Sequence, residues 1–260
     1  MGLTCHLNSV LQILAVIPEF VEAISNLASF TDTLSANIYN TLVQLNSEVD
    51  VHGNAIHIER ITEKLGSHIL QMQDCIDTYE EIINHISHEV RDHMSAIDIK
   101  SLFQTCIQRK DGTRIQELTT YAYAASADVI KFLNQKKNDF QFFVPPLIFV
   151  INLCRMPETD EYHHCDTKFS FPIELNLRAI SSGVHKKYEL IGIIAYADSH
   201  FVSFVNKNGT WKICDDSKVF ICPKRYIYDL FGGPQDPDKN SLWQIMEKKF
   251  VARLLFYKAI

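Results

Sequence analysis

The spacing of apolar residues changes near the middle of this chain, and that change limits the folds open to it. From Leu7 to about Leu133, apolar residues recur every three or four positions, which places them on one face of a helix. From Pro146 onward, they form short β-branched and aromatic runs that are typical of strands. A helical half followed by a strand-rich half predicts an α+β fold in which helices and strands are segregated.

The same patterns predict where the elements lie. Helices are expected in three segments: one that carries Leu7, Val10, Leu11 and Leu14 and ends at Pro18, one over 56–70, and one from about Asp74 to Val90. Strands are expected over 147–153, 169–175, 188–196, 201–205, 211–214 and 251–257. Loops are expected over 31–35, 47–54, 109–113, 155–167 and 232–240. The Asn208-Gly209 pair predicts a hairpin turn between two of the strands.

Composition excludes several classes of protein. Hydrophobic residues make up 47% of the 260 residues and charged residues 22%, as in a globular chain with a packed core. The formal net charge of −6 argues against a surface for nucleic acid or an anionic membrane. No apolar run reaches the ~18–20 residues of a membrane span, and no basic residue precedes the apolar N-terminal stretch as in a secretory signal. The 7 cysteines, an odd number without a framework spacing, indicate free thiols in a cytoplasmic or nuclear protein.

Cys5 stands where the first predicted helix begins. Thr4 is a typical N-cap residue, so Cys5 is expected in the first helical turn. Unpaired backbone N–H groups and the helix dipole favour a thiolate there, and the thiolate is the nucleophilic form of cysteine. Taken alone, a cysteine is far more often a buried structural residue, so the case for Cys5 depends on its context.

His200 and Asp215 supply the groups that a cysteine nucleophile needs. His200 begins an alternating strand-like run, and the Asn208-Gly209 turn would fold the next strand back beside it. Asp215 would then lie close to His200, where a carboxylate orients an imidazole toward sulfur. Taken singly, His200 is one of 11 histidines and Asp215-Asp216 reads as a solvated turn. The order and spacing of all three favour a catalytic set.

Several segments resemble the ubiquitin-specific proteases, and they occur in that family's order. Residues 2–12, Gly-Leu-Thr-Cys-His-Leu-Asn-Ser-Val-Leu-Gln, resemble its cysteine box, G-N-T-C-Y-M-N-S-x-L-Q. Residues 188–219 resemble its histidine box, Y-x-L … G-H-Y … W-x-x-x-D-D-x-x-V. Shorter matches are found at 73–77 (Q-D-A-x-E), 145–155 (P-P-x-L-x-x-x-L-K-R-F), 168–177 (V-x-F-P-x-x-L-D-L) and 252–257 (A-Y-x-L-F-Y). Together they cover almost the whole chain.

The resemblance implies a papain-like cysteine protease fold in one catalytic domain over 1–260. A helical thumb would span 1–105, a reduced fingers region 106–143, and an antiparallel-sheet palm 144–260. The resemblance assigns Cys5 as the nucleophile, His200 as the general base and Asp215 as the residue that orients it, with Asp216 in an auxiliary position. It implies a deubiquitinase that hydrolyses the bond after the C-terminal glycine of ubiquitin in conjugates of ubiquitin or a ubiquitin-like protein, without a cofactor.

Departures from the family pattern leave alternatives open. The family's oxyanion-stabilising Asn, five positions before the cysteine, would stand before the first residue of this sequence, so either upstream residues are missing or the enzyme uses a substitute. The Cys-x-x-Cys pairs that bind zinc in the fingers of many relatives are missing too, so we expect no metal. His163-His164-Cys165 reads as a loop, and the histidines between 52 and 93 read as solvent-exposed. Two other functions therefore stay possible: a catalytically weak or inactive ubiquitin-binding module, and a protease for SUMO or another ubiquitin-like protein.

Overall fold

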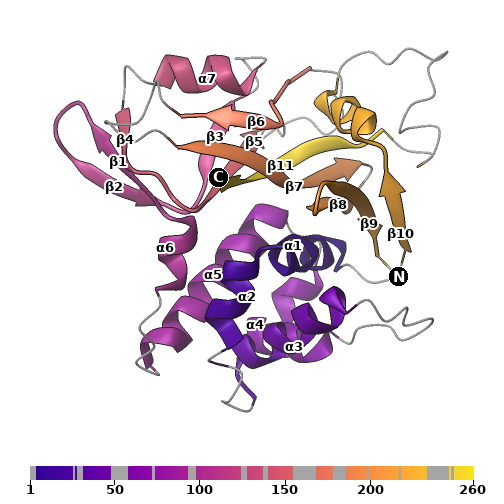
Figure 1. The fold of residues 1–260 in the computed structure, drawn as a ribbon. Helices are drawn as coiled ribbons and strands as arrows, with labels where there is room; N and C mark the ends of the chain where they lie inside the picture. Colours follow the sequence, from indigo (N-terminus) through magenta and orange to yellow (C-terminus); the bar gives the residue numbers. More distant parts are fainter. Residues whose placement is uncertain are drawn as a thin grey trace.

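In the computed structural model of this chain, a layer of helices packs against one face of a large β-sheet (Figure 1). The structure describes residues 4–25, 27, 32–47, 58–71, 74–92, 98–123, 128–136, 140–154, 168–177, 186–197, 199–216, 218–232, 246 and 249–260. Within these residues, helices and strands are segregated along the chain, as the change in apolar spacing predicts.

Helices fill the N-terminal part of the chain. They are α1 (Cys5–Ala15), α2 (Pro18–Ser25), α3 (Leu34–Asn46), α4 (Glu59–Leu65), the 3₁₀ helix η1 (Ser67–Leu70), α5 (Cys75–Asp92) and α6 (Ile99–Phe103). α1 begins at Cys5 with Thr4 at the N-cap position, as predicted, although the side chain of Thr4 makes no capping hydrogen bond. Pro18 ends the first apolar stripe and also begins α2, because a first helical position needs no N–H donor.

Two further helix predictions need correction. The helix expected over 56–70 is broken at Gly66, whose φ of 107° no helix tolerates, and residues 56 and 57 lie outside the described residues. The loop expected over 31–35 is cut short because α3 starts at Leu34, where the Thr33 side chain accepts a capping bond from the backbone N of Ala36. The helix expected from about Asp74 is confirmed as α5.

Strands appear earlier in the chain than predicted. β1 (Thr105–Arg109), β2 (Arg114–Glu117) and β4 (Phe140–Val144) form a small sheet in the order β2-β1-β4. β3 (Thr120–Tyr123) instead pairs in parallel with β5, and α7 (Val129–Lys136) follows it. The prediction of helix, which we extended to Leu133, is therefore wrong over 105–123. Short runs of alternating residues form strands in this segment.

The large sheet holds the C-terminal half. Its order is β10-β9-β8-β7-β11-β5-β3, with β6 paired to β7. The remaining bounds are β5 (Ile148–Cys154), β6 (Glu174–Asn176), β7 (Lys187–Ala197), β8 (His200–Lys207), β9 (Thr210–Asp215), β10 (Lys218–Cys222) and β11 (Val251–Ala259). Five of the six expected strands are confirmed, whereas the run at 169–175 contributes only the start of β6, and β10 was not expected.

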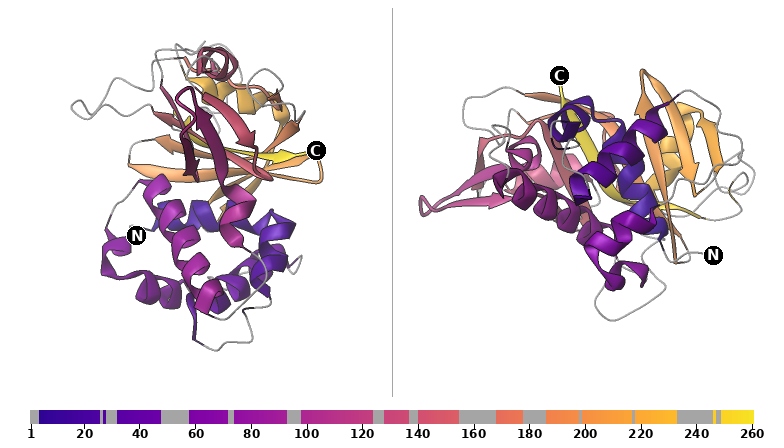
Figure 2. Two further views of the ribbon diagram at one scale, coloured as in Figure 1. Left: turned by 90° about the vertical axis from the view of Figure 1, so that its left-hand side faces the viewer. Right: turned by 90° about the horizontal axis from the view of Figure 1, so that it is seen from below.

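Apolar side chains cover both faces of this sheet. α1 packs beneath β7 and β8 on one face, while α7 and the 3₁₀ helix η4 (Lys224–Phe231) cover the opposite face (Figure 2). Gly192 of β7 marks the close approach of α1, since a Cβ at this position would lie 2.6 Å from Cδ1 of Ile13. The absence of a side chain at Gly192 therefore lets α1, which begins at Cys5, pack close to the sheet.

No single helix among the described residues is long and apolar enough to cross a membrane. α1 and α2 meet that criterion only when they are counted together, and the pair is bent by 93°.

Candidate active site

Tight hairpins place His200 and Asp215 at the same end of the large sheet. Ala197 pairs with His200, so two residues join β7 to β8, and Asp215 pairs with Lys218, so two residues join β9 to β10. Because β8 and β9 are antiparallel neighbours, both turns lie at one end, which we call the His200 end of the sheet. The predicted Asn208-Gly209 turn joins β8 to β9 at the other end, with φ values of 55° and 82°.

The side chains of His200 and Asp215 point to the same face of the sheet. Ser203 opposes Cys214 in the β8–β9 register, which puts Asp215 diagonally across from His200. His200 Nε2 lies 2.7 Å from Asp215 Oδ1, and the two side chains are 22% and 27% exposed. Since a carboxylate only accepts, Nε2 donates this bond, and Nδ1 is left for another group. The sequence-based expectation that these two residues meet is confirmed as a contact.

Asp216 faces the helices instead. It has a left-handed φ of 49° directly after β9, and its Oδ1 accepts a 3.1 Å hydrogen bond from Asn8 Nδ2. Asn8 lies three residues after Cys5 on α1, and residues at that spacing share one side of a helix. The Asn8–Asp216 bond therefore places the first turn of α1, including Cys5, at the His200 end of the sheet.

Cys5 is the first residue of α1 and is 6% exposed. It belongs to the apolar cluster that also contains Phe201 and Cys214. The first intrahelical bond runs from Asn8 N to Thr4 O, so the N–H groups of the preceding turn have no partner within the helix. These N–H groups and the helix dipole favour negative charge beside Cys5.

Burial makes four of the other described cysteines poor nucleophiles. It raises the pKa of Cys75 well above the ordinary value, raises that of Cys154, and raises those of Cys214 and Cys222 to about 11 and about 12. A thiol with a raised pKa stays protonated at neutral pH and reacts slowly. Cys106 lies in β1 of the small sheet, away from the His200 end, so Cys5 is the candidate nucleophile that remains among the described cysteines.

The same end offers oxygen and nitrogen ligands to a cation. One ligand atom each from His200, Asp215 and Asp216 lies within 4.8 Å of the others. Both carboxylates already have partners, His200 for Asp215 and Asn8 for Asp216, so the geometry is accounted for without an ion. The expectation of no metal stays a prediction. His163-His164-Cys165 lies outside the described residues, as do His52, His57 and His93, whereas His68, His85 and His88 are exposed as predicted.

A buried ion pair also joins helices to sheet, and the sequence analysis missed it. Arg253 of β11 bonds to the Asp74 carboxylate at the start of α5, and its guanidinium donates to Asn152 Oδ1 at 2.9 Å and Leu153 O at 2.8 Å. Burial alone would lower the pKa of Arg253, but the hydrogen bond and charge of Asp74 outweigh it and hold that pKa above its ordinary value. We call this group the Arg253 clamp.

A bulge in β11 makes the Arg253 clamp possible. The register against β7 shifts between Ala252 and Leu254, so the alternation of faces is interrupted and the Arg253 side chain reaches the helical side. The one available signal was a single charged residue inside the apolar run 251–257. Asn8, the other missed residue, gives no signal by spacing, because its partner is 208 residues away.

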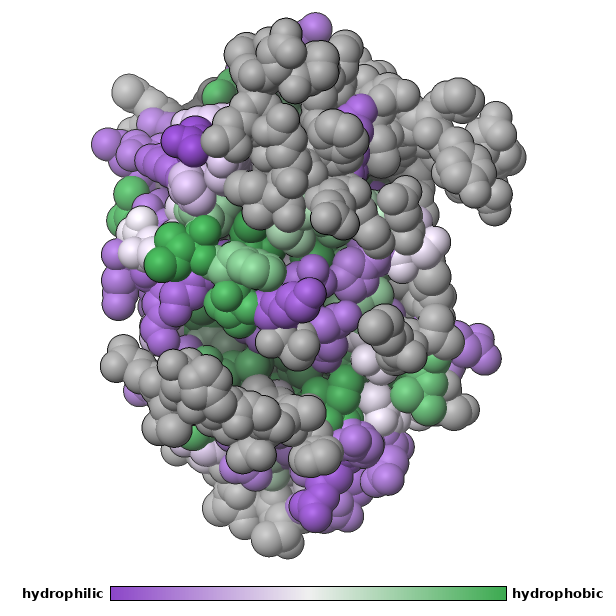
Figure 3. All heavy atoms as spheres, turned by 90° about the vertical axis from the view of Figure 1, so that its right-hand side faces the viewer, coloured by the Kyte–Doolittle hydropathy of each residue, from purple (hydrophilic) through white to green (hydrophobic). Residues whose placement is uncertain are grey.

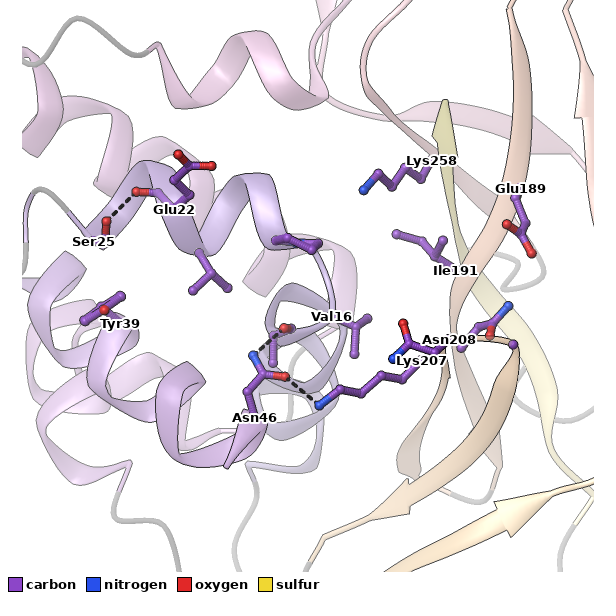
Figure 4. A pocket seen from close by; sticks show the side chains of 15 residues that line it. Val16, Glu22, Ser25, Tyr39, Asn46, Glu189, Ile191, Lys207, Asn208 and Lys258 are labelled. Atoms are coloured by element: carbon purple, nitrogen blue, oxygen red, sulfur yellow. Dashed lines mark hydrogen bonds between the residues drawn. The ribbon is translucent and has the colours of Figure 1, made fainter. Parts of the chain in front are cut away.

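One cavity lies far from these residues. It has a volume of about 830 Å³ and sits between α1, α2 and α3 on one side and β7, β8 and β11 on the other (Figure 4). Lys207 of β8 reaches across it to Asn46 Oδ1 at 3.5 Å, next to the Asn208-Gly209 turn. The cavity is therefore at the opposite end of β8 from His200.

Comparisons with known proteins agree with this architecture. The profile of the family described as ubiquitin carboxyl-terminal hydrolase matches residues 1–257. Two structures of the SAGA DUB module that contains Ubp8, Sgf11, Sgf73 and Sus1 align with 100% of this chain, with TM-scores of 0.76 and 0.73 at 17% and 18% identity. A yeast SAGA DUB module with a mutant Sgf73 aligns with 99% of it, with a TM-score of 0.73 at 19% identity. The chain spans 66% of the first two aligned chains and 65% of the third.

Proposed function

This chain belongs to the ubiquitin carboxyl-terminal hydrolase family, and from that premise we propose that it is a thiol-dependent deubiquitinase that cleaves after the C-terminal glycine of ubiquitin. The observation that carries the proposal is the 2.7 Å contact between His200 and Asp215 at the sheet end that meets the first turn of α1. The papain-like fold shared with the aligned structures supports it. Within that fold we retain the division into a thumb over 1–105, fingers over 106–143 and a palm over 144–260 as part of the proposal.

In the proposed mechanism, the thiol of Cys5 first transfers its proton to His200. Because Nε2 of His200 is held by Asp215, Nδ1 is the nitrogen that takes the proton of the Cys5 thiol. The Cys5 sulfur then attacks the carbonyl carbon of the terminal glycine and forms a tetrahedral intermediate. His200 returns its proton to the leaving lysine amine as the C–N bond breaks, which leaves a thioester on Cys5.

Water completes the cycle. His200, now neutral, takes a proton from a water molecule, whose oxygen attacks the thioester carbonyl. Collapse of the second intermediate breaks the C–S bond, returns the proton to the Cys5 sulfur through His200, and releases the ubiquitin carboxylate. Asp215 acts as a positioning residue throughout, since it holds the ring orientation and stabilises the charged imidazolium.

Backbone groups of α1 supply the proposed oxyanion stabilisation. The N–H groups of the first turn of α1 precede the first intrahelical bond, and we expect them to face the substrate carbonyl oxygen, which becomes the oxyanion when the Cys5 sulfur attacks the carbonyl carbon. One oxyanion donor typically contributes ~10²–10³ in rate. We expect these backbone donors to carry part of the oxyanion stabilisation in this chain.

Two other functions compete with this proposal. An inactive ubiquitin-binding module would use the same fold without chemistry. A protease for SUMO or another ubiquitin-like protein would use the same chemistry on a different modifier. The triad-like placement of His200 and Asp215 favours an active enzyme over the inactive module, because a binding module has no need of an imidazole oriented by a carboxylate.

Labelling with ubiquitin that carries a C-terminal electrophile separates these functions. We expect a covalent adduct with the wild-type chain and none with Cys5→Ala. Cys106→Ala is the matched control, since it removes a half-exposed thiol of the small sheet, and it should label like the wild type.

Each alternative gives its own result. Tight binding of ubiquitin without an adduct would support the inactive module. An adduct with a SUMO electrophile and none with the ubiquitin electrophile would support the third function. Loss of labelling in Cys106→Ala but not in Cys5→Ala would show that the nucleophile is misassigned.

A further inference from the structure

His6 is a buried titratable residue that the proposed mechanism does not use. It directly follows Cys5 on α1 and is 0% exposed. A polar side chain is costly to bury unless it is hydrogen-bonded. Nδ1 of His6 forms a hydrogen bond of 2.8 Å with Oγ1 of Thr78, a residue that is also 0% exposed and lies near the start of α5. The residue next to the candidate nucleophile is therefore tied to α5.

Asn8 holds the same turn of α1 from a different direction. Successive residues of a helix are turned by about 100° around its axis, so His6 and Asn8, two residues apart, point about 200° away from each other. His6 bonds to α5 in the helical layer, whereas Asn8 bonds to Asp216 in the turn after β9. These two hydrogen bonds hold the start of α1 from nearly opposite sides, in the same turn as Cys5.

The two bonds give α1 a directional restraint that apolar attraction lacks. Leu7, Val10 and Leu14 anchor α1 in the core, but the hydrophobic effect has no preferred direction, whereas a hydrogen bond does. Side chains extend about 5–6 Å from a helix axis, so a rotation of about 10° moves the Cys5 sulfur by about 1 Å. Misplacement of a reacting group by that distance can cost ~10² in rate.

We propose that His6 is a positioning residue of the active site. Its bond to Thr78, together with the bond of Asn8 on the other side, sets the rotation of α1 about its axis. This rotation directs the Cys5 thiol toward His200. Loss of either bond leaves α1 packed against the sheet but lets its first turn rotate, which moves the sulfur out of line with the imidazole.

His6 acts through Cys5 and not on the substrate. β9 and β10 lie at the right-hand side of Figure 1, and Figure 3 faces this side, where hydrophobic residues gather at middle height between the sheet and the helices. A substrate would reach the first turn of α1 from this surface, since the turn after β9 carries the Asn8–Asp216 bond. His6 is turned away from Asn8 and is fully buried, so ubiquitin would not contact it.

This inference rests on the proposed function, so its test uses ubiquitin joined through its C-terminus to a fluorescent amine. Thr78→Val removes the hydroxyl and keeps the shape of the side chain. We expect kcat to fall by about tenfold or more while KM changes by less than about twofold, because the contact affects the chemical step and not the binding of ubiquitin. Thr41→Val is the matched control and should keep the kcat of the wild type, since its buried hydroxyl bonds to Asn37 O within α3.

Conservative variants separate positioning from a general loss of stability. Thr78→Ser keeps a hydroxyl, and His6→Asn places an amide group close to the position of Nδ1, so both should retain most of the kcat. His6→Leu has no hydrogen-bonding group and should lose as much kcat as Thr78→Val. The double variant of His6→Leu and Thr78→Val should lose no more than either single one, because both substitutions remove the same contact. Each variant is assayed at a temperature at which circular dichroism shows it folded.

Several outcomes would overturn the proposal. One is a Thr78→Val variant that melts at a lower temperature but keeps the kcat of Thr41→Val, since the bond would then serve folding alone. Another is a raised KM with unchanged kcat, which would mean that His6 shapes the surface that binds ubiquitin. A wild-type chain that cleaves no ubiquitin amide would overturn the proposed function and this inference together, whereas equal kcat of both threonine variants in an active chain would overturn this inference alone.

Discussion

Two of the polar contacts that join the helices to the large sheet differ in almost every physical respect. The Asn8–Asp216 bond links α1 to the turn after β9, is 3.1 Å long and is exposed to solvent. The Arg253 clamp links α5 to β11 and β5, is largely buried and joins opposite charges. The first contact lies at the His200 end of the sheet, beside the turn that carries Asp215, whereas the second lies within the packed interface.

The difference suggests a division of labour between the two contacts. A buried charge pair is costly to break, because the remaining partner stays in a site where water cannot solvate it. An exposed neutral-to-charged hydrogen bond contributes little to folding, since water replaces it. We therefore expect changes at the Arg253 clamp to appear in stability and changes at the His200 end to appear in activity.

Substitution of Asp215 should produce the largest effect. Asp215→Ala removes the group that orients His200, and we expect cleavage of a ubiquitin amide to fall by about 10²–10⁴, the usual contribution of a positioned acid–base group. The free energy of unfolding should change by less than about 1 kcal/mol, because the carboxylate is partly exposed. Asp216→Ala is the control and should lose much less activity; the reverse ranking would mean that the two acids have exchanged roles.

Substitution of Asp74 tests the contribution of the Arg253 clamp to stability. Asp74→Ala leaves the Arg253 guanidinium buried without its charge partner and removes the Oδ1 that accepts from Ile76 N. We expect a loss of about 3 kcal/mol in urea unfolding, at the lower end for breaking a buried ion pair. Asp77→Ala, three residues along α5 and exposed, should change stability by less than about 0.5 kcal/mol. Similar losses in both variants would show that the Arg253 clamp does not hold the interface.

Local sequence patterns predicted the His200 end better than the Arg253 clamp. The alternation of β8 and the Asn208-Gly209 turn are sufficient to place Asp215 beside His200, because a tight turn fixes the register of both strands. Both signals lie within 16 residues, from His200 to Asp215, and both are properties of one hairpin. The contact could therefore be predicted without knowledge of the rest of the fold.

The Arg253 clamp could not be predicted from local sequence patterns. Its partners Asp74 and Arg253 are 179 residues apart, and the bulge that turns Arg253 toward the helices leaves no periodic trace in the sequence. The helix break at Gly66 and the start of α2 at Pro18 were missed for a related reason: proline and glycine mark a change of backbone direction, but not whether a helix starts or ends there. β10 was missed because its exposed apolar residues do not alternate with polar ones.

A double-mutant cycle tests the exposed Asn8–Asp216 bond. Asn8→Ala and Asp216→Ala should each lower ubiquitin amide cleavage by up to about tenfold, because either loses the bond that ties α1 to the turn beside Asp215. The double variant should lose no more than either single one, since both remove the same contact. Asp216→Asn keeps an acceptor and should retain most activity. Additive losses would mean that Asn8 and Asp216 act separately.

The smallest effect concerns another contact between the layers, the partly buried pair of Glu19 on α2 and Lys258 on β11, 2.7 Å apart. Burial alone would raise the pKa of Glu19, but the hydrogen bond and charge of Lys258 outweigh it, so this pKa is lowered in the folded state. The stability that the pair contributes is therefore fully present above the ordinary glutamate pKa of about 4.3 and is lost as pH falls through the lower folded value.

Lys258→Met should consequently cost about 1 kcal/mol at pH 7, near the upper end for a solvent-accessible ion pair, because this pair is only partly exposed. Urea unfolding at a series of pH values should show this difference from the wild type shrinking below about pH 4, as Glu19 takes up a proton first in the unfolded state and, at lower pH, in the folded state. A difference that stays constant to pH 2 would mean that Lys258 stabilises the interface through its aliphatic chain rather than its charge. Contacts between the two layers would then depend on charge only where they are buried, as at the Arg253 clamp.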